Sequence, residues 1–230
     1  MEAHRHRTSV QGPVPDAIAV STRSTDRGFA WSICNDSGVP VEVHSVSAVC
    51  TLTGITGRVR MFRNGWQSWS ETSVATLGVD EDPALTPGAL ELMRMSHHAD
   101  SALPAADRLR SEMATVLCDD RGAVLAGFLG GDLHDGTIWL AHGRTGQELR
   151  IQAFLGGAVM APGEHRDLHE VRLEAVADAN EALADWAAEY GRRQLARTGS
   201  PYQLGWCSWY HYFENVREMD VRENLSAAAD

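Results

Sequence analysis

The sequence predicts a mainly β protein, in which an antiparallel β-sandwich is followed by one helix and then by a strand–loop–helix segment. Three observations predict this order. From about Phe29 to Ala177, apolar residues alternate with polar ones and turn residues interrupt the pattern, as is typical of antiparallel strands with one buried face. After Val176 the apolar spacing becomes that of a helix. The aromatic stretch GWCSWYHYF at 205–213 then opens a further segment.

The first predicted strands lie in residues 29–49, FAWSICNDSGVPVEVHSVSAV. Two alternating runs are separated there by the turn residues NDSG at 35–38, a pattern that predicts a β-hairpin. Residues 1–15 precede these strands and begin with a polar, basic stretch that includes His4 and Arg7. No apolar run follows as a secretory signal would require, and we expect residues 1–15 to be disordered.

Strand patterns continue through the second half of the sandwich. MATVLCDDRGAVLAGFL at 113–129 predicts two strands joined around Asp120, Arg121 and Gly122. Three further segments show strand-like alternation between Gly, Pro or charged residues: TIWLAHG at 137–143, ELRIQAFLGG at 148–157 and LHEVRLEAV at 168–176. Between Leu77 and Arg108 the pattern is irregular and holds three prolines, so this part is expected to form a long loop or a short helix.

A helix is predicted in DANEALADWAAEYGRRQLAR at 178–197. Asp178 and Glu181 have the spacing of a capping box. The apolar residues Leu183, Trp186, Ala187 and Tyr190 follow the i, i+3, i+4, i+7 spacing of one helix face. TGSP at 198–201 ends the helix, because a proline disfavours helix in the residue before it.

We therefore expect three regions: a β-sandwich domain at 1–177, a linker helix at 178–200, and the start of a second domain at 201–230. The last region reads as a buried strand, a loop and the opening of a helix. One strand–helix unit has no parallel neighbour and no cover for its faces. The pattern thus predicts the front part of a larger enzyme, truncated within its second domain.

The charge balance restricts the partners. The net charge of −11 disfavours nucleic acid and anionic membrane surfaces, and no apolar run is long enough to span a membrane. All twenty basic residues are arginine. The absence of lysine excludes a Schiff-base nucleophile and a P-loop lysine within these residues.

Cysteine and histidine do not form the patterns of a disulfide framework or a metal site. The four cysteines are widely spaced and form no CxxC pair, which is typical of reduced thiols and predicts a cytoplasmic protein. His97 and His98 are adjacent, and His165 and His169 are four residues apart. On a strand the latter two would lie roughly 13 Å apart, too far to share one ion. We expect no metal.

Two stretches resemble glycoside hydrolase family 36, the melibiase or α-galactosidase family: RMFRNGWQSWS at 60–70 and LGWCSWYHYF at 204–213. In that family an N-terminal β-supersandwich precedes a catalytic (β/α)8 barrel, and a GWxSW motif forms the first barrel strand. The resemblance implies that residues 201–230 begin such a TIM barrel, and that the longer protein hydrolyses terminal α-linked galactose. It implies no cofactor, galactosides or oligosaccharides as substrates, and assembly as a homo-oligomer.

The resemblance also identifies candidate site residues. Trp209 matches the family's sugar-stacking tryptophan, whereas Trp206 is expected to pack in the outer layer of the barrel. For Trp66 in NGWQSWS, two interpretations remain open: it anchors a turn to the sandwich core, or it reaches a sugar site in a neighbouring subunit. Both Trp66 and Trp209 are therefore candidate substrate-binding residues.

No catalytic residue is expected within the chain. The family's retaining mechanism uses two carboxylates about 5 Å apart, and its nucleophilic aspartate follows a lysine by two residues. This chain contains no lysine, so the nucleophile segment is missing and the chain alone is expected to be inactive. The acidic runs at 80–82 and 119–120 lie beside turn signals and are expected to be solvated loop charges.

Two alternatives remain open. Within the enzymes, the resemblance also includes α-N-acetylgalactosaminidases and galactosyl-transferring raffinose or stachyose synthases, which differ in barrel residues outside this chain. Outside the enzymes, the sandwich would be a non-catalytic module that binds carbohydrate or supports oligomer assembly. Exposed tryptophans suit the binding of sugar.

Overall fold

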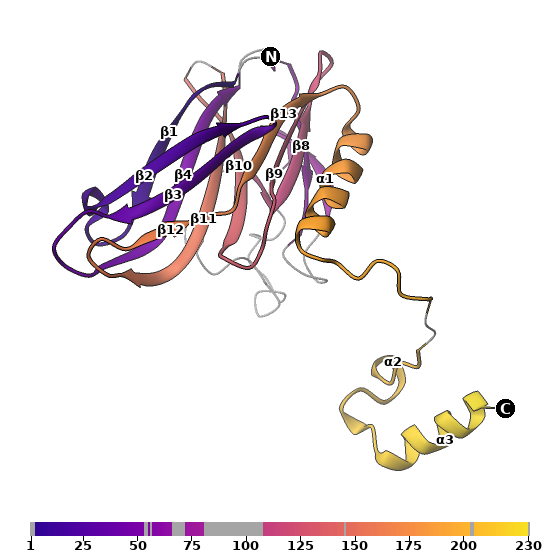
Figure 1. Ribbon diagram of the computed structural model, residues 1–230. Coiled ribbons are helices and arrows are strands. Elements are labelled where there is room, and N and C mark those ends of the chain that lie inside the picture. Colours follow the sequence, from indigo (N-terminus) through magenta and orange to yellow (C-terminus); the bar gives the residue numbers. More distant parts are fainter. Residues whose placement is uncertain are drawn as a thin grey trace. The chain divides into compact units, whose positions relative to one another are not determined.

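The computed structural model describes residues 3–52, 55, 57–65, 72–80, 108–144, 146–202 and 205–229 (Figure 1). The chain divides into two compact units, Met1–Ala196 and Arg197–Asp230. Of the described elements, the strands, a short 3-10 helix and one α-helix belong to the first unit, and the aromatic stretch and the last helix belong to the second.

Two antiparallel sheets form the first unit. The five-stranded sheet, called sheet A, has the order β1-β4-β11-β10-β7. Its strands are β1 (Ala3–Gln11), β4 (Val41–Leu52), β7 (Arg108–Glu112), β10 (Asp135–His142) and β11 (Gln147–Met160).

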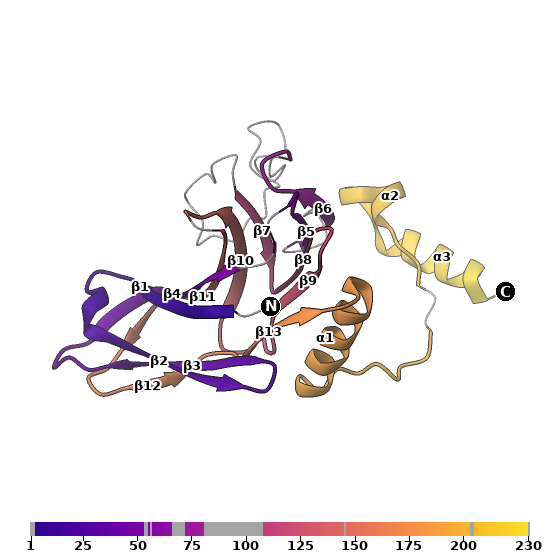
Figure 2. The same cartoon turned by 90° about the horizontal axis from the view of Figure 1, so that it is seen from above.

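The eight-stranded sheet, called sheet B, has the order β12-β3-β13-β9-β8-β5-β6, with β2 paired to the other edge of β3. Its strands are β2 (Ile18–Thr25), β3 (Gly28–Asn35), β5 (Arg60–Arg63), β6 (Ser73–Thr76), β8 (Ala114–Cys118), β9 (Ala123–Phe128), β12 (His165–Asp167) and β13 (Val171–Val176). A short 3-10 helix, η1 (Pro15–Ala17), precedes β2. Figure 2 shows β1, β4 and β11 in one layer and β2, β3 and β12 in another.

The hydrophobic core lies between the two sheets. Every second residue of β3 is buried, including Phe29, Trp31 and Ile33, and these side chains pack in one cluster with residues of sheet A such as Ile138 and Ile151. The period-two pattern of the sequence therefore marks the face of each strand that meets the other sheet. The predicted mainly β, antiparallel architecture is confirmed.

Strands β7 and β8 form one chain segment that changes sheet at Met113. This residue adopts the left-handed conformation, with φ of 64°, which bends the strand. Its N–H donates to Gly136 O of β10 at 2.9 Å, and its carbonyl accepts from Phe128 N of β9 at 2.9 Å. The bend thus ties a strand of sheet A to a strand of sheet B.

The predicted hairpin at residues 29–49 is wrong, although its turn is present. β3 belongs to sheet B and β4 to sheet A, so the chain crosses between the sheets. The side chain of the buried Asn35 holds this crossing: its Nδ2 donates to Val39 O at 2.8 Å and to Met160 O at 2.9 Å, and its Oδ1 accepts from Ser37 N. Both strands can then bury an apolar face on the shared core from opposite sides.

The N-terminal expectation also differs from the structure. Residues 1–15 were expected to be disordered, but Ala3–Gln11 forms β1, which pairs with β4 along its length. Main-chain hydrogen bonds in a ladder do not require apolar side chains. A polar sequence at the edge of a sheet can therefore pair without showing a hydrophobic pattern.

The predicted two-strand segment at 113–129 and the predicted helix are confirmed. β8 and β9 pair antiparallel around a turn in which Asp119 Oδ1 accepts from Arg121 N. The helix α1 spans Ala179–Arg193, and the Asp178 side chain accepts from Asn180 N and Glu181 N. It ends four residues before the predicted limit, where Leu195 adopts a φ of 52° and Ala196 N donates to Gly191 O at 2.8 Å, which closes the last turn.

Helix α1 covers the outer face of sheet B over β8, β9 and β13 (Figure 1). Val116 and Leu125 of the sheet and Ala182 of the helix form a second apolar cluster, against which Trp186 packs. β8 and β9 are consequently buried on both faces. The indole Nε1 of Trp186 donates to Phe128 O at 3.0 Å, so the ring lies directly on the strand.

An ion cluster also holds α1 to the sheet. The guanidinium of Arg172 on β13, 2% exposed, contacts Glu174 at 2.5 Å and Asp185 at 2.7 Å. Arg27 contacts the same two carboxylates at 2.9 and 2.7 Å, and both arginines lie within 4 Å of Glu189. Asp185 and Glu189 belong to α1, so the ion pairs of Arg27 and Arg172 connect sheet B to the helix.

The second unit contains helices where a barrel strand was expected. Residues 205–208 form no strand, Trp209–Tyr212 forms the short helix α2, and Phe213–Asn215 forms the 3-10 helix η4. The last helix, α3, spans Glu218–Ala229 and agrees with the expected helix. The strand prediction is wrong in this structure because a strand needs a neighbour for its N–H and C=O groups, and no described strand pairs with residues 205–208.

We predict that Gly127→Ala destabilises the first unit by about 1–3 kcal/mol. A Cβ at this position would lie 2.5 Å from Trp186 Nε1 and 2.9 Å from its Cδ1, so the indole must move and its bond to Phe128 O is strained. Urea unfolding monitored by tryptophan fluorescence measures the change. Gly38→Ala is the matched control, because nothing lies within 4 Å of its Cβ. Equal stability of the two variants would contradict the close packing of α1.

Candidate functional site

Trp209, the candidate sugar-stacking residue, begins α2 in the second unit. Its side chain is 51% exposed, and Trp206 is exposed to a similar degree. Both indoles therefore have an accessible face. The expectation that Trp206 packs in an outer barrel layer stays a prediction, because the described residues include no barrel strand.

The aromatic side chains of this segment hold one another in place. The rings of Trp209 and Phe213 have centroids 4.5 Å apart, and those of Trp206 and Tyr212 are 5.9 Å apart, both with edge-to-face geometry. Asn224 of α3 donates from Nδ2 to the Tyr212 hydroxyl at 3.1 Å. Helix α3 is thus bonded to the aromatic segment, and such contacts stabilise ring orientation.

This arrangement suits the binding of a sugar ring more than it suits bond chemistry. A half-exposed indole such as that of Trp209 offers a flat apolar face. Sugars carry a complementary face of C–H groups.

Trp66, the other candidate, lies outside the described residues, as does Trp69. The two residues before Trp66 are described and are fixed to the sandwich. Asn64 N donates to Ser111 Oγ at 2.7 Å and Asn64 Nδ2 to Glu112 O at 2.9 Å. The start of the NGWQSWS segment is therefore anchored to β7.

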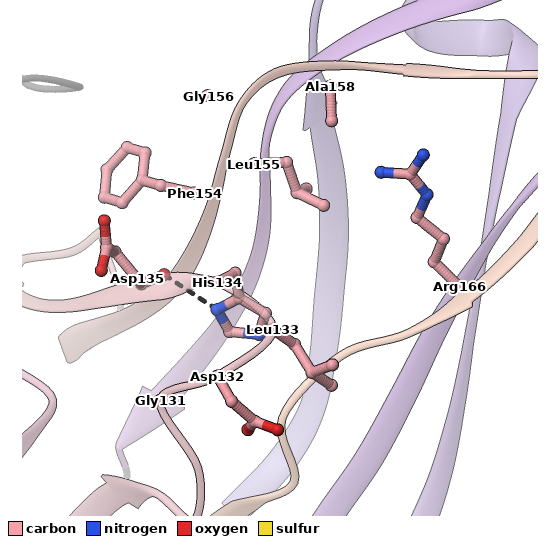
Figure 3. A pocket seen from close by; sticks show the side chains of 10 residues that line it. All are labelled: Gly131, Asp132, Leu133, His134, Asp135, Phe154, Leu155, Gly156, Ala158 and Arg166. Carbon is pink, nitrogen blue, oxygen red and sulfur yellow. Dashed lines mark hydrogen bonds between the residues drawn. The ribbon is translucent and has the colours of Figure 1, made fainter.

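A cavity that the sequence did not predict lies in the sandwich, with a volume of about 340 Å³. Three segments far apart in the chain form it: the β9–β10 connection, the middle of β11, and β12 (Figure 3). Its lining residues are Gly131, Asp132, Leu133, His134, Asp135, Phe154, Leu155, Gly156, Ala158 and Arg166. The paired glycines at 130–131 and 156–157 were the only sequence signal for it, because they mark irregular backbone.

Two buried histidines hold the β9–β10 connection in place. The backbone N–H of His169 donates to His134 Nε2 at 3.0 Å, and the ring nitrogen Nδ1 of His134 contacts the backbone oxygen of Asp135 at 2.8 Å. In turn, Leu133 N donates to His169 Nε2 at 2.9 Å. Each Nε2 atom accepts a backbone hydrogen bond, so the geometry requires both rings to be neutral with the proton on Nδ1.

Burial lowers the pKa of both histidines. It lowers the pKa of His134 to about 4, with the neighbouring His169 adding to the shift. Burial also lowers the pKa of His169, although the Asp132 carboxylate, 3.7 Å from its Nε2, opposes the shift. Protonation of either ring would break a backbone hydrogen bond of the connection.

The described residues show neither a metal cluster nor a membrane-spanning helix. In this part of the chain, no three His, Cys, Asp or Glu side chains are grouped so that they could hold a metal ion. None of the described helices combines the length and the apolar character that crossing a bilayer needs.

No protein-family model and no curated protein matches the chain. Solved structures that resemble it include a variant of the GH36 alpha-galactosidase AgaA from Geobacillus stearothermophilus in complex with stachyose (9% identity, TM-score 0.48, 90% of this chain and 29% of that chain). Another is an alpha-galactosidase from Lactobacillus brevis (9% identity, TM-score 0.48, 99% of this chain and 34% of that chain). A third is the galactosidase domain of the alpha-galactosidase-sucrose kinase AgaSK (10% identity, TM-score 0.43, 96% of this chain and 34% of that chain).

The chain spans about a third of the length of these structures. At 9–10% identity and with TM-scores below 0.5, the likeness assigns no function by itself. The functional argument therefore rests on the residues of this chain.

We predict that the first unit loses stability between pH 6.5 and pH 4. Over this range the unfolded chain binds a proton at His134 while the folded chain does not, because the folded pKa is about 4. The free energy of unfolding should fall by about 3 kcal/mol from this group as the pH falls. Urea unfolding at a series of pH values measures the slope.

His134→Gln keeps a neutral acceptor at this position and should reduce that slope. His165→Gln, at an exposed histidine of β12, is the control and should keep the slope of the unchanged protein. An identical pH profile for His134→Gln would refute the role of the buried ring.

Proposed function

We propose that this chain is the N-terminal portion of an α-galactosidase-like retaining glycoside hydrolase, whose catalytic carboxylates lie outside these residues. The observation that carries the proposal is the GWCSW motif with a half-exposed Trp209, which the aromatic rings and α3 hold in place. The GWQSW motif, which begins at Gly65 directly after the anchored Asn64, supports it.

In this proposal, Trp209 stacks on the apolar face of the terminal galactose and orients its anomeric carbon. The reaction itself needs a nucleophilic carboxylate and an acid/base carboxylate on either side of the glycosidic bond. The family's nucleophile segment contains a lysine and this chain has none, so both carboxylates belong to the longer protein. No metal or organic cofactor takes part.

The sandwich would then be a rigid support and an assembly surface in a cytoplasmic homo-oligomer. Its core and the docked α1 give it the rigidity that a positioned loop requires. Trp66, which follows the anchored Asn64 by two residues, would be a second sugar-contacting residue.

Activity assays with p-nitrophenyl α-D-galactopyranoside test the proposal. The 230-residue chain should release no p-nitrophenol, whereas a longer product of the same gene with a lysine-x-aspartate segment should release it. Turnover by the 230-residue chain would contradict the proposal, because it would require carboxylates within these residues. Galactoside binding without turnover by any product of the gene would favour a non-catalytic carbohydrate-binding module.

Substitution of Trp209 tests the role of the indole. In the active longer product, Trp209→Ala should reduce kcat/KM about tenfold or more, equivalent to about 1.4 kcal/mol of lost binding. Tyr210 is the adjacent and more exposed aromatic residue of the same helix. Tyr210→Ala is therefore the matched control, and its kcat/KM should stay within about threefold of that of the unchanged enzyme. Equal effects of the two substitutions on kcat/KM would contradict the proposal that Trp209 contacts the sugar.

A further inference from the structure

The cavity in the sandwich combines features of a small-ligand site that the catalytic proposal does not use. We propose that it binds a neutral monosaccharide unit, independently of Trp209. The site would belong to the first unit alone, since all of its lining residues lie between Gly131 and Arg166.

The size and construction of the cavity fit one sugar ring. Its volume of about 340 Å³ lies at the lower end of the range for small-molecule pockets. The hollow is built into the backbone: β11 loses its register with β4 between Phe154 and Ala158. Gly156 and Gly157 within this bulge have φ of 63° and 81°, which only glycine adopts without strain.

The backbone of the cavity is held firmly. The β9–β10 connection is fixed by the bonds between His134, His169 and the backbone of Leu133. On the opposite side, Arg166 donates from Nε to Glu164 at 2.6 Å and from Nη2 to Val159 O at 3.1 Å. A preorganised site loses less free energy on binding than a mobile one.

The polar lining suits hydroxyl groups, which both donate and accept. The carboxylate of Asp132, 70% exposed at the rim, provides acceptors. A guanidinium has five N–H donors, so the two bonds of Arg166 leave donors for a ligand. Figure 3 shows the Asp132 carboxylate and the Arg166 guanidinium on different sides of the cavity, so that a ring between them could use both.

The apolar lining and the charge favour a neutral ligand. Leu133, Phe154 and Leu155 provide the apolar surface that the C–H face of a sugar needs. Two carboxylates line the cavity against one guanidinium, in a chain of net charge −11, which disfavours an anion. The described residues do not form a metal cluster here.

Saturation-transfer difference NMR on the 230-residue chain tests the proposal, with methyl α-D-galactopyranoside and methyl α-D-glucopyranoside as probes. We expect saturable binding of at least one probe, with a Kd on the order of 1 mM. Two variants address the cavity directly. Ala158→Leu places a larger side chain in the space that Ala158 faces (Figure 3), and Asp132→Asn removes a carboxylate at an exposed position.

Both cavity variants should weaken binding at least tenfold while circular dichroism and the unfolding midpoint stay unchanged. Val159→Leu is the matched control, because Val159 is exposed and points to the opposite face of the same strand. It should bind as the unchanged chain does. Trp209→Ala should also leave binding at the cavity intact.

Three results would overturn the proposal: no binding of either probe at tens of millimolar, full binding by both cavity variants, or loss of binding in Trp209→Ala alone. The last result would assign the sugar to the aromatic segment and leave the catalytic proposal standing. Conversely, absence of α-galactosidase activity in any longer product would not affect the cavity, because the NMR measurement requires no turnover.

Discussion

The passage of the chain between its two sheets is the constraint on which the structure of the first unit depends. At Met113 one strand leaves sheet A and enters sheet B, and the left-handed backbone there bonds to both sheets. A second crossing follows directly, because β9 in sheet B is connected to β10 in sheet A. Both crossings fix the spacing of the sheets and hence the volume that core side chains such as Phe128 and Ile138 must fill.

The second crossing also produces the features that are unusual for a core. Its backbone leaves both ladders and needs other hydrogen-bond partners, because buried polar groups without partners are costly. His169 provides a neutral acceptor for Leu133 N of this crossing, and His134 in turn accepts from the backbone N–H of His169, which explains why two imidazoles are buried here. The cavity lies between this β9–β10 connection and the β11 bulge at Gly156 and Gly157, where side chains do not fill the space.

Helix α1 completes the unit by a different physical principle. Sheet B has a second apolar face over β8 and β9, and the helix removes it from water with Ala182 and Trp186. The buried Arg172 lies at the same boundary, and its carboxylate partners on α1 offset the cost of removing a charge from water. In the proposed enzyme, this firmly docked helix leads from the sandwich to the segment that carries Trp209.

The sequence by itself determined the local features: the strand segments at 114–128, the helix start at Asp178 and its apolar face, because these depend on side-chain period and on caps a few residues apart. It also identified the aromatic segment at 205–213 as a candidate site. Only the tertiary structure decided that β3 and β4 lie in different sheets and that a polar N-terminus forms β1. The same holds for the cavity, whose lining comes from three distant segments. Pairing partners, buried polar contacts and cavities depend on contacts between residues far apart in the chain, and a local hydrophobic period contains no information about them.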